Sequence, residues 1–241
     1  MSDSEEWQLD INQVFQNALK NNLWKIDLSS QDLESIEHKT LGKLTSLEVL
    51  NLSNNKLTSI PDVICKLPRL RRLILSNNKL KELPEKLGKL TTLEWLHVSN
   101  NPLLTKLPDI SQLTNLVELD VSHCSLPSLP GGLGKLKRIA TIDASYNKIR
   151  VVHPTFCKLK TLGRLYLNNN NLSVIPNELS QLQNLRIIDL SYNNLISLPP
   201  SLKNLSNLWE FHLEGNEGMS FPPKEVIEKG LDEIINYLKN I

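Results

Sequence analysis

A leucine or isoleucine recurs at a constant interval along most of the chain, and each one opens the same eleven-residue pattern. The pattern is L-x-x-L-x-L-x-x-N-x-L, and its clearest copies are residues 47–57, 70–80 and 162–172. Eight copies start 23 residues apart, at Leu47, Leu70, Leu93, Leu116, Ile139, Leu162, Leu185 and Leu208. A looser ninth copy starts at Leu23. This period predicts a solenoid, because a single unit cannot bury its own leucines and must stack on others.

The two halves of each unit predict different local structures. In L-x-L, the leucines point one way and the residue between them points the other way, as in a short β-strand. The second half, x-x-L-P-x-x-L-x-x-L, predicts a short helical segment, because proline is tolerated in the first turn of a helix. We therefore predict an α/β horseshoe of nine 23–24-residue units over residues 23–222. Its parallel sheet would line the concave side, and the helical segments would line the convex side.

Amphipathic stretches at the two ends of the chain predict helical caps. Residues 1–22 can form a helix that starts at Ser2 or Ser4 and has an apolar face. That face would hold Trp7, Ile11, Val14, Phe15, Ala18 and Leu19. Residues 223–241 are again apolar on one side, and Gly230 can divide them into two helices. Each cap would cover the leucines at one open end of the solenoid, so we expect no second domain.

The asparagine of each unit predicts a structural ladder. Its side-chain amide has two donors and one acceptor, which can satisfy backbone groups of its own turn and of the adjacent turns. The asparagines at this position are Asn55, Asn78, Asn101, Asn147, Asn170, Asn193 and Asn216. In a stack of units, they would lie one above another and hold the turns together.

Composition and charge exclude several classes of function. The chain has 48 leucines and 26 asparagines among 241 residues, and its net charge is +1, so no overall field attracts nucleic acid. No apolar run is long enough to cross a membrane, and the amino terminus lacks the features of a signal peptide. Three widely spaced cysteines predict a reducing compartment, the cytoplasm or the nucleus.

Catalytic motifs such as G-x-S-x-G and H-E-x-x-H are missing from the sequence, so we expect no enzyme, metal or cofactor. We expect a monomer.

The full unit, LxxLxLxxNxLxxLPxxLxxL, resembles the repeat of the intracellular Ras-group leucine-rich repeat proteins. That group includes Ras-suppressor-like, Shoc-like, Scribble-type and Erbin-type chains, and the resemblance covers nearly the whole sequence. It implies a leucine-rich repeat solenoid that acts as a scaffold or adaptor in signalling. It also implies a protein partner, either a small GTPase or a regulator of one.

Three departures from the repeat pattern stand out. Cys124 occupies the ladder position in the fourth strict unit. The fifth unit reads Val151-Val152-His153-Pro154 in place of Leu-Pro, and the third delays its Leu107-Pro108 by one residue. We interpret Cys124 as a small buried filler in an asparagine position.

The positions between the leucines of the strands face the concave side, where core packing does not dictate the residue type. A contiguous group there is rich in aromatic and charged side chains, the types enriched at protein-binding hot spots. We predict that it binds a protein partner. The group consists of Trp95, His97, Glu118, Asp120, His123, Asp143, Tyr146, Arg164, Tyr166, Arg186 and Tyr192.

Other interpretations of this group remain open. It can be an exposed sheet face without a role. The acidic and histidine members, Asp120, Asp143, His97 and His123, lie on adjacent strands and could instead serve a metal-dependent or acid/base hydrolase. A structural subunit of a stable assembly is a third possibility.

A row of lysines occupies the same position of successive units on the convex side. It consists of Lys43, Lys66, Lys89, Lys135 and Lys158. We interpret the row as a solvated face, and the alternative is weak contact with acidic lipids or with an acidic second partner.

Overall fold

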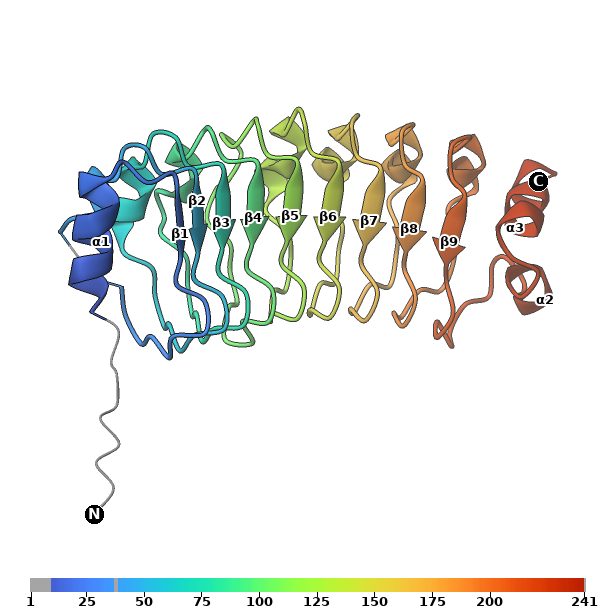
Figure 1. Cartoon of the computed structure of the whole chain (residues 1–241). Helices are drawn as coiled ribbons and strands as arrows, with labels where there is room; N and C mark the ends of the chain where they lie inside the picture. The colour runs from blue at the N-terminus through green and yellow to red at the C-terminus, as the bar shows by residue number, and fades with distance from the viewer. Residues whose placement is uncertain (1–9, 37–38, 241) are drawn as a thin grey trace, which may run out of the picture.

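The computed structural model describes residues 10–36 and 39–240, and these form a single curved solenoid (Figure 1). Nine strands of three residues each pair in parallel in sequence order, from β1 to β9. They are β1 (Lys25–Asp27), β2 (Val49–Asn51), β3 (Arg72–Ile74), β4 (Trp95–His97), β5 (Glu118–Asp120), β6 (Thr141–Asp143), β7 (Arg164–Tyr166), β8 (Ile187–Asp189) and β9 (Glu210–His212). The predicted fold class, with nine parallel strands in one open sheet, is confirmed.

The leucines of the repeat build one continuous core. The middle residue of every strand from β1 to β8 is buried, as Leu73 and Leu119 show with no exposed surface. The residues on either side of it face the concave surface and are partly or fully exposed. This two-residue alternation is the reason why the sequence pattern and the strand register agree at every step, for example Leu73 opposite Leu96.

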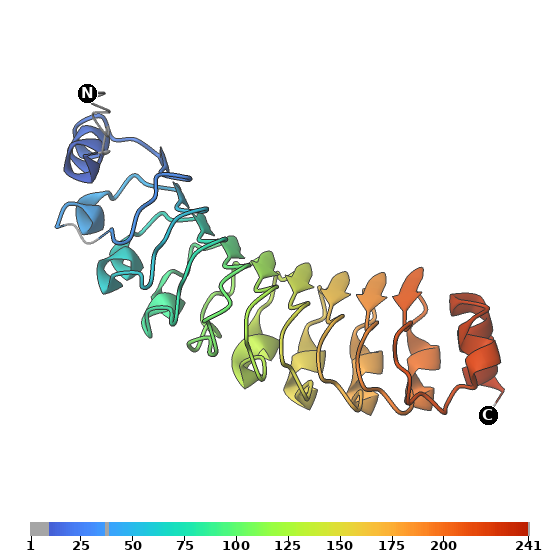
Figure 2. The same ribbon diagram turned by 90° about the horizontal axis from the view of Figure 1, so that it is seen from below.

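Short 3₁₀ helices line the convex side (Figure 2). They are η1 (Leu41–Lys43), η2 (Asp62–Lys66), η3 (Leu87–Lys89), η4 (Gly131–Lys135), η5 (Pro154–Lys158), η6 (Asn177–Gln181) and η7 (Pro200–Asn204). The prolines lie slightly earlier than we expected, since Pro61, Pro130 and Pro176 are the residues just before the helix. Between consecutive strands of the described chain, only the connection from β4 to β5 lacks such a helix.

The ladder asparagines bind backbone groups of two successive turns, their own and the preceding one. Asn101 has no exposed surface, and its Nδ2 donates to the carbonyl oxygens of Leu75 (3.1 Å), Val98 (2.8 Å) and Ser99 (3.3 Å). Its Oδ1 accepts the N–H of Leu80 at 3.0 Å. Each ladder amide therefore satisfies groups that the stacked turns would otherwise bury without partners.

The ladder changes where Cys124 replaces asparagine. Its Sγ lies 3.5 Å from the carbonyl oxygens of Val98 and Ser122, but it offers no oxygen to accept an N–H from the previous turn. That turn has no need of one, because the N–H of Leu104 donates to the carbonyl of Asn101 at 2.9 Å. The delayed Leu107-Pro108 and the cysteine at the ladder position are therefore structurally linked, because the turn that contains the delay does not need an asparagine in the next repeat.

We expect that Cys124→Asn will not stabilise the protein, although it restores the repeat pattern. The new Oδ1 would be buried without the N–H that other ladder asparagines receive, at a cost of about 1–3 kcal/mol. The free energy of unfolding from urea titration tests this. A gain in stability would show that the N–H of Leu104 can change partner.

Helices cap both ends. At the amino end, α1 (Ile11–Lys20) begins after Asp10, whose carboxylate accepts the N–H groups of Asn12 and Gln13. Phe15 and Ala18 are buried against the first repeat. Ser2, Ser4 and Trp7, which we expected in this helix, lie outside the described residues.

At the carboxyl end, α2 (Lys224–Ile227) and α3 (Leu231–Lys239) are separated by Gly230, whose φ of 90° favours glycine. Ile234 and Leu238 of α3 are buried, and α3 packs against η7 on the convex side. Across the described residues, we find no helix with the length and apolar character needed to cross a membrane.

Candidate functional site

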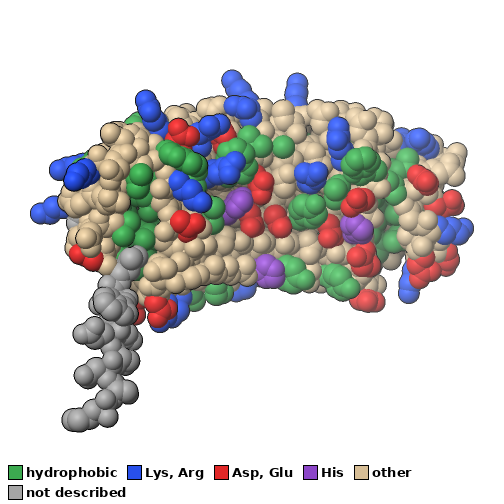
Figure 3. Space-filling model, viewed as in Figure 1, with side chains coloured by type: hydrophobic (Ala, Val, Ile, Leu, Met, Phe, Trp, Pro, Cys, Tyr) green, Lys and Arg blue, Asp and Glu red, His purple; other side chains and the backbone are tan. Residues whose placement is uncertain are grey.

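The sheet brings most of the predicted site residues together on one face. Trp95 and His97 of β4 lie opposite Glu118 and Asp120 of β5 in the strand register. Asp120 lies opposite Asp143, and Asp143 lies opposite Tyr166, so the row continues to β7, which also carries Arg164. Figure 3 shows this face, where apolar, acidic, basic and histidine side chains gather over the strands.

Three further site residues sit in the turns that follow the strands, and all three have a left-handed backbone. The φ angles are 51° for His123, 51° for Tyr146 and 50° for Tyr192. The same turn position holds asparagine in four other repeats, and asparagine tolerates this conformation. Bulky side chains are rare there because their Cβ approaches the following carbonyl oxygen. Tyr146 and Tyr192 therefore carry local backbone strain at these positions.

The turn aromatics form an exposed row along the carboxyl ends of the strands. The rings of His123 and Tyr146 stack with centroids 4.1 Å apart and an interplanar angle of 11°. Tyr146 is 47% exposed and Tyr192 is 57% exposed. A Cβ at Gly215 would lie 2.5 Å from Cδ1 of Tyr192, so glycine is the residue that admits this ring. Ordered but exposed aromatic rings can contribute contact area to a partner at a low entropic cost.

We expect Tyr192→Asn to leave the free energy of unfolding unchanged or to raise it by up to about 1 kcal/mol, because asparagine relieves the left-handed strain. Tyr192→Val, which puts a β-branched residue in the same conformation, should lower it by about 1–2 kcal/mol. Chemical denaturation of the two variants tests this pair. If both variants are equally destabilised, the ring supports the fold, and its exposure has no functional meaning.

The acidic side chains of this face form hydrogen bonds with the turns that follow their strands. Asp120 Oδ1 accepts the N–H and the hydroxyl of Ser122 (3.0 and 2.7 Å), and Asp143 does the same with Ser145 (2.9 and 2.6 Å). Burial raises the pKa of Asp143 above its usual range, although the bonds from Ser145 oppose this shift. In the part of the chain that the structure describes, no three His, Cys, Asp or Glu side chains are grouped as metal ligands would be. The described residues therefore provide no set of metal ligands for the metal-dependent form of the hydrolase interpretation.

His97 is the most enclosed histidine of the group. Its Nε2 is buried and lies 3.0 Å from Glu118 Oε1, out of line for a hydrogen bond. The two side chains therefore face each other across neighbouring strands, β4 and β5.

Two cation–π contacts change the composition of the site. The guanidinium of Arg72 lies over the ring of Trp95, 4.1 Å from its centroid, so Arg72 joins the face although we did not predict it. The sequence could have predicted this contact, because Arg72 and Trp95 occupy the same position of consecutive repeats. Arg186 precedes β8 and lies 5.7 Å from the ring centroid of Trp209, which is 62% exposed.

Arg186 therefore stands apart from the turn aromatics. It lies at the amino ends of the strands, in the row where Arg71 pairs with Glu94 at 2.7 Å. Tyr146 and Tyr192 lie at the carboxyl ends. The structure divides the predicted group into a main concave face and a separate edge pair, Arg186 with Trp209.

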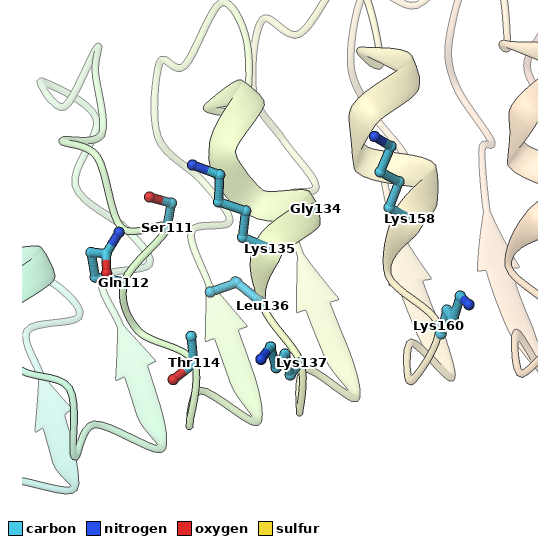
Figure 4. A pocket seen from close by; sticks show the side chains of 9 residues that line it. All are labelled: Ser111, Gln112, Thr114, Gly134, Lys135, Leu136, Lys137, Lys158 and Lys160. Carbon is cyan, nitrogen blue, oxygen red and sulfur yellow. The ribbon is translucent and has the colours of Figure 1, made fainter.

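Two lysines of the convex row, Lys135 and Lys158, border a hollow of about 520 Å³ (Figure 4). It opens beside the connection from β4 to β5, which lacks a helix and contributes Ser111, Gln112 and Thr114. Lys135 and Lys158 extend over it from η4 and η5, and Lys137 and Lys160 come from the turns that follow these helices. Contact of these lysines with an acidic surface remains a hypothesis.

The three cysteines are buried and unsuited to nucleophilic chemistry. Burial raises the pKa of the Cys65 and Cys124 thiols to about 11 and that of Cys157 to about 12. A thiol with such a pKa carries almost no thiolate at neutral pH.

Comparisons with known proteins agree with this architecture. A family model described as leucine rich repeat matches residues 21–80, 68–126 and 160–217. Among solved structures, a leucine-rich repeat protein of Leptospira interrogans is 29% identical, with a TM-score of 0.77 over 86% of this chain. This chain spans 58% of the length of that protein.

Two plant receptors are also similar. The ectodomain of the Arabidopsis thaliana membrane receptor kinase GASSHO1/SCHENGEN3, in complex with Casparian strip integrity factor 2, is 33% identical with a TM-score of 0.71. The match covers 80% of this chain and 24% of the receptor. A plant peptide hormone receptor in complex with RGF2 is 28% identical with a TM-score of 0.72, covering 83% of this chain and 35% of that one. The family match, together with the nine-stranded solenoid, shows that this chain belongs to the leucine-rich repeat family.

Proposed function

We propose that this protein is a non-enzymatic binding module that holds a protein partner on its concave face, from β4 to β8. The observation that carries the proposal is the left-handed turn position, where His123, Tyr146 and Tyr192 replace the asparagine that the backbone prefers. A sequence selected for stability alone would keep asparagine there. The similar plant receptors, which are described in complexes with their ligands, support a binding role for this type of solenoid.

The turn residues Tyr146 and Tyr192 anchor the partner together with two strand residues. These are Trp95, which Arg72 holds from one side, and Tyr166 on β7. The side chains of Trp95 and Tyr166 stand on the concave surface and take no part in the leucine core. Trp95→Ala and Tyr166→Ala should each weaken partner binding by about 2 kcal/mol or more, with the thermal midpoint almost unchanged. Calorimetric titration of the partner, once affinity purification and mass spectrometry identify it, measures this effect.

The matched controls are Lys89→Ala and Lys158→Ala on the convex side, which should leave binding nearly unchanged. If these lysine variants lose the partner and the aromatic variants retain it, the binding site lies on the lysine row. Recovery of the partner in fixed stoichiometry at high salt would instead favour a structural subunit of a stable assembly.

The resemblance to the Ras group supports a more specific proposal, in which the module is a cytoplasmic signalling adaptor. Its partner would be a small GTPase or a regulator of one. Purified small GTPases, loaded with GDP or with a non-hydrolysable GTP analogue, test this by titration. Absence of binding in both nucleotide states would remove the GTPase as the direct partner and leave the concave-face proposal intact.

A further inference from the structure

At the free edge of the last strand, β9, some backbone groups find no hydrogen-bond partner among the described residues. In every earlier repeat, the next strand supplies a partner for the equivalent groups. From Leu28 to Leu190, the residue after each strand donates its N–H to the next strand, eight times in succession. The last of these bonds joins the N–H of Leu190 to the carbonyl of His212 at 2.9 Å. The equivalent N–H of the ninth repeat belongs to Leu213, and no acceptor for it is found among the described residues.

Neighbouring backbone groups of the ninth repeat also lack hydrogen-bond partners in the described chain. Tyr192 N–H donates to the carbonyl of Glu214 at 2.7 Å, whereas the equivalent N–H of Gly215 finds no acceptor in the described chain. The carbonyl of Arg186 accepts from Trp209 (2.9 Å) and from Glu210 (3.1 Å). The equivalent carbonyl of Trp209 accepts from no described backbone group. The edge of β9 therefore presents donors and an acceptor in the spacing of a parallel strand.

The carboxyl-terminal cap leaves this edge uncovered. Because α3 packs against η7 on the convex side, a groove of about 510 Å³ remains between β9 and the cap. Its apolar lining comes from Phe211, Leu213, Met219, Ile227 and Ile234. Leu213 is 4% exposed, so its unpaired N–H lies in a mostly buried position, where a missing hydrogen bond is costly.

The charges around the groove are mainly acidic. Glu214, Glu217 and Glu228 line it together with a single cation, Lys224, which already lies 3.8 Å from Glu228. No ion pair within the described chain involves Glu214 or Glu217. Figure 3 shows acidic side chains gathered at this end of the solenoid. A basic ligand would be attracted there.

We propose that this groove binds an extended peptide as a tenth parallel strand, with the side-chain pattern apolar–basic–apolar. The peptide backbone would accept from the N–H groups of Leu213 and Gly215 and donate to the carbonyl of Trp209, repeating the bonds between β8 and β9. Its apolar residues would lie against Phe211 and Ile234, and its basic residues would meet Glu214 and Glu217. Strand addition of this kind takes affinity from the main chain and specificity from the alternate side chains. The groove lies at the edge of β9, beyond Tyr192 in the neighbouring turn, and it does not depend on the function proposed above.

Binding of a fluorescein-labelled hexapeptide of alternating lysine and leucine, measured by anisotropy, tests the proposal. The double variant Glu214→Gln/Glu217→Gln should bind this peptide at least tenfold more weakly. Glu178→Gln on η6, which removes an exposed acid that does not line the groove, should bind it normally, as should Trp95→Ala. Amide exchange at Leu213 and Gly215, followed by NMR, should slow at least tenfold when the peptide is bound.

A second pair of probes separates strand addition from attraction between side chains. The same hexapeptide, N-methylated at alternate residues, is tested in both registers, and one register should lose binding because it removes the N–H that meets Trp209. Equal binding of both methylated peptides, or unchanged exchange at Leu213 and Gly215, overturns the proposal. Exchange at these amides that slows with protein concentration in the absence of peptide also overturns it, since a second copy of the chain would then occupy the edge.

Discussion

Asn78→Ala should lower the free energy of unfolding by about 2–4 kcal/mol, since it leaves several buried backbone groups without partners. The amide Nδ2 of Asn78 donates to the carbonyls of Leu52 and Leu75, both at 3.0 Å, and Oδ1 accepts the N–H of Leu57 at 3.0 Å. These bonds join two successive turns, and no water can replace the amide without a cavity that is large enough to hold it. Urea titration followed by circular dichroism measures the loss.

Asn170→Ala should behave like Asn78→Ala, because Asn170 makes the same set of bonds in a later repeat. The control is Lys89→Ala, which truncates an exposed convex side chain and should change stability by less than about 0.5 kcal/mol. Equal denaturation midpoints for all three variants would show that the ladder contributes little to stability.

The second large effect concerns the approach of neighbouring convex segments. Gly134→Ala should cost about 3 kcal/mol, because its new Cβ would overlap the carbonyl oxygen of Thr155 in the next repeat. The obstacle is backbone, so it cannot rotate away as a side chain would. Relief requires η4 and η5 to separate, which disturbs the core beneath both helices.

Gly131→Ala is the matched control in the same helix. Its Cβ would have only Thr155 Oγ1 nearby, at 3.9 Å, and its backbone is not left-handed. This substitution should be neutral or stabilise the fold by about 0.4–1 kcal/mol through the unfolded state. The difference between the thermal midpoints of the two variants measures the cost of the steric overlap. Equal midpoints would mean that the convex helices are free to move apart.

The strands could be predicted from the sequence because a buried parallel sheet imposes a strict pattern. Each strand must alternate between core and surface, and stacking repeats the alternation at one period, so Leu73, Leu96 and Leu119 identify their neighbours. The same rule placed Trp95, Asp120 and Tyr166 on the concave face. Local periodicity carries this information, and no long-range contact was needed to derive it.

The remaining features depend on geometry that no pattern of residue types expresses. The link between Cys124 and the delayed Leu107-Pro108 lies in one backbone bond, from Leu104 to Asn101. Arg186 is an exception, because the 23-residue period already aligned it with Arg71 and Glu94 before their strands, and its residue type alone brought it into the predicted group. The groove beside β9 remains because α3 packs against η7, and the sequence of the cap does not reveal which element α3 contacts.

The connection from β4 to β5 has a mechanical consequence for the whole array. At this junction the outer helix is missing, and a thiol stands where an amide would bind the previous turn. In a linear array, each unit is coupled only to its neighbours, so one weak junction divides the cooperative unit. A pulling force applied to the two ends should therefore separate the protein into two blocks. One holds α1 with β1 to β4, the other holds β5 to β9 with α2 and α3, and each would keep a helical cap at its outer end.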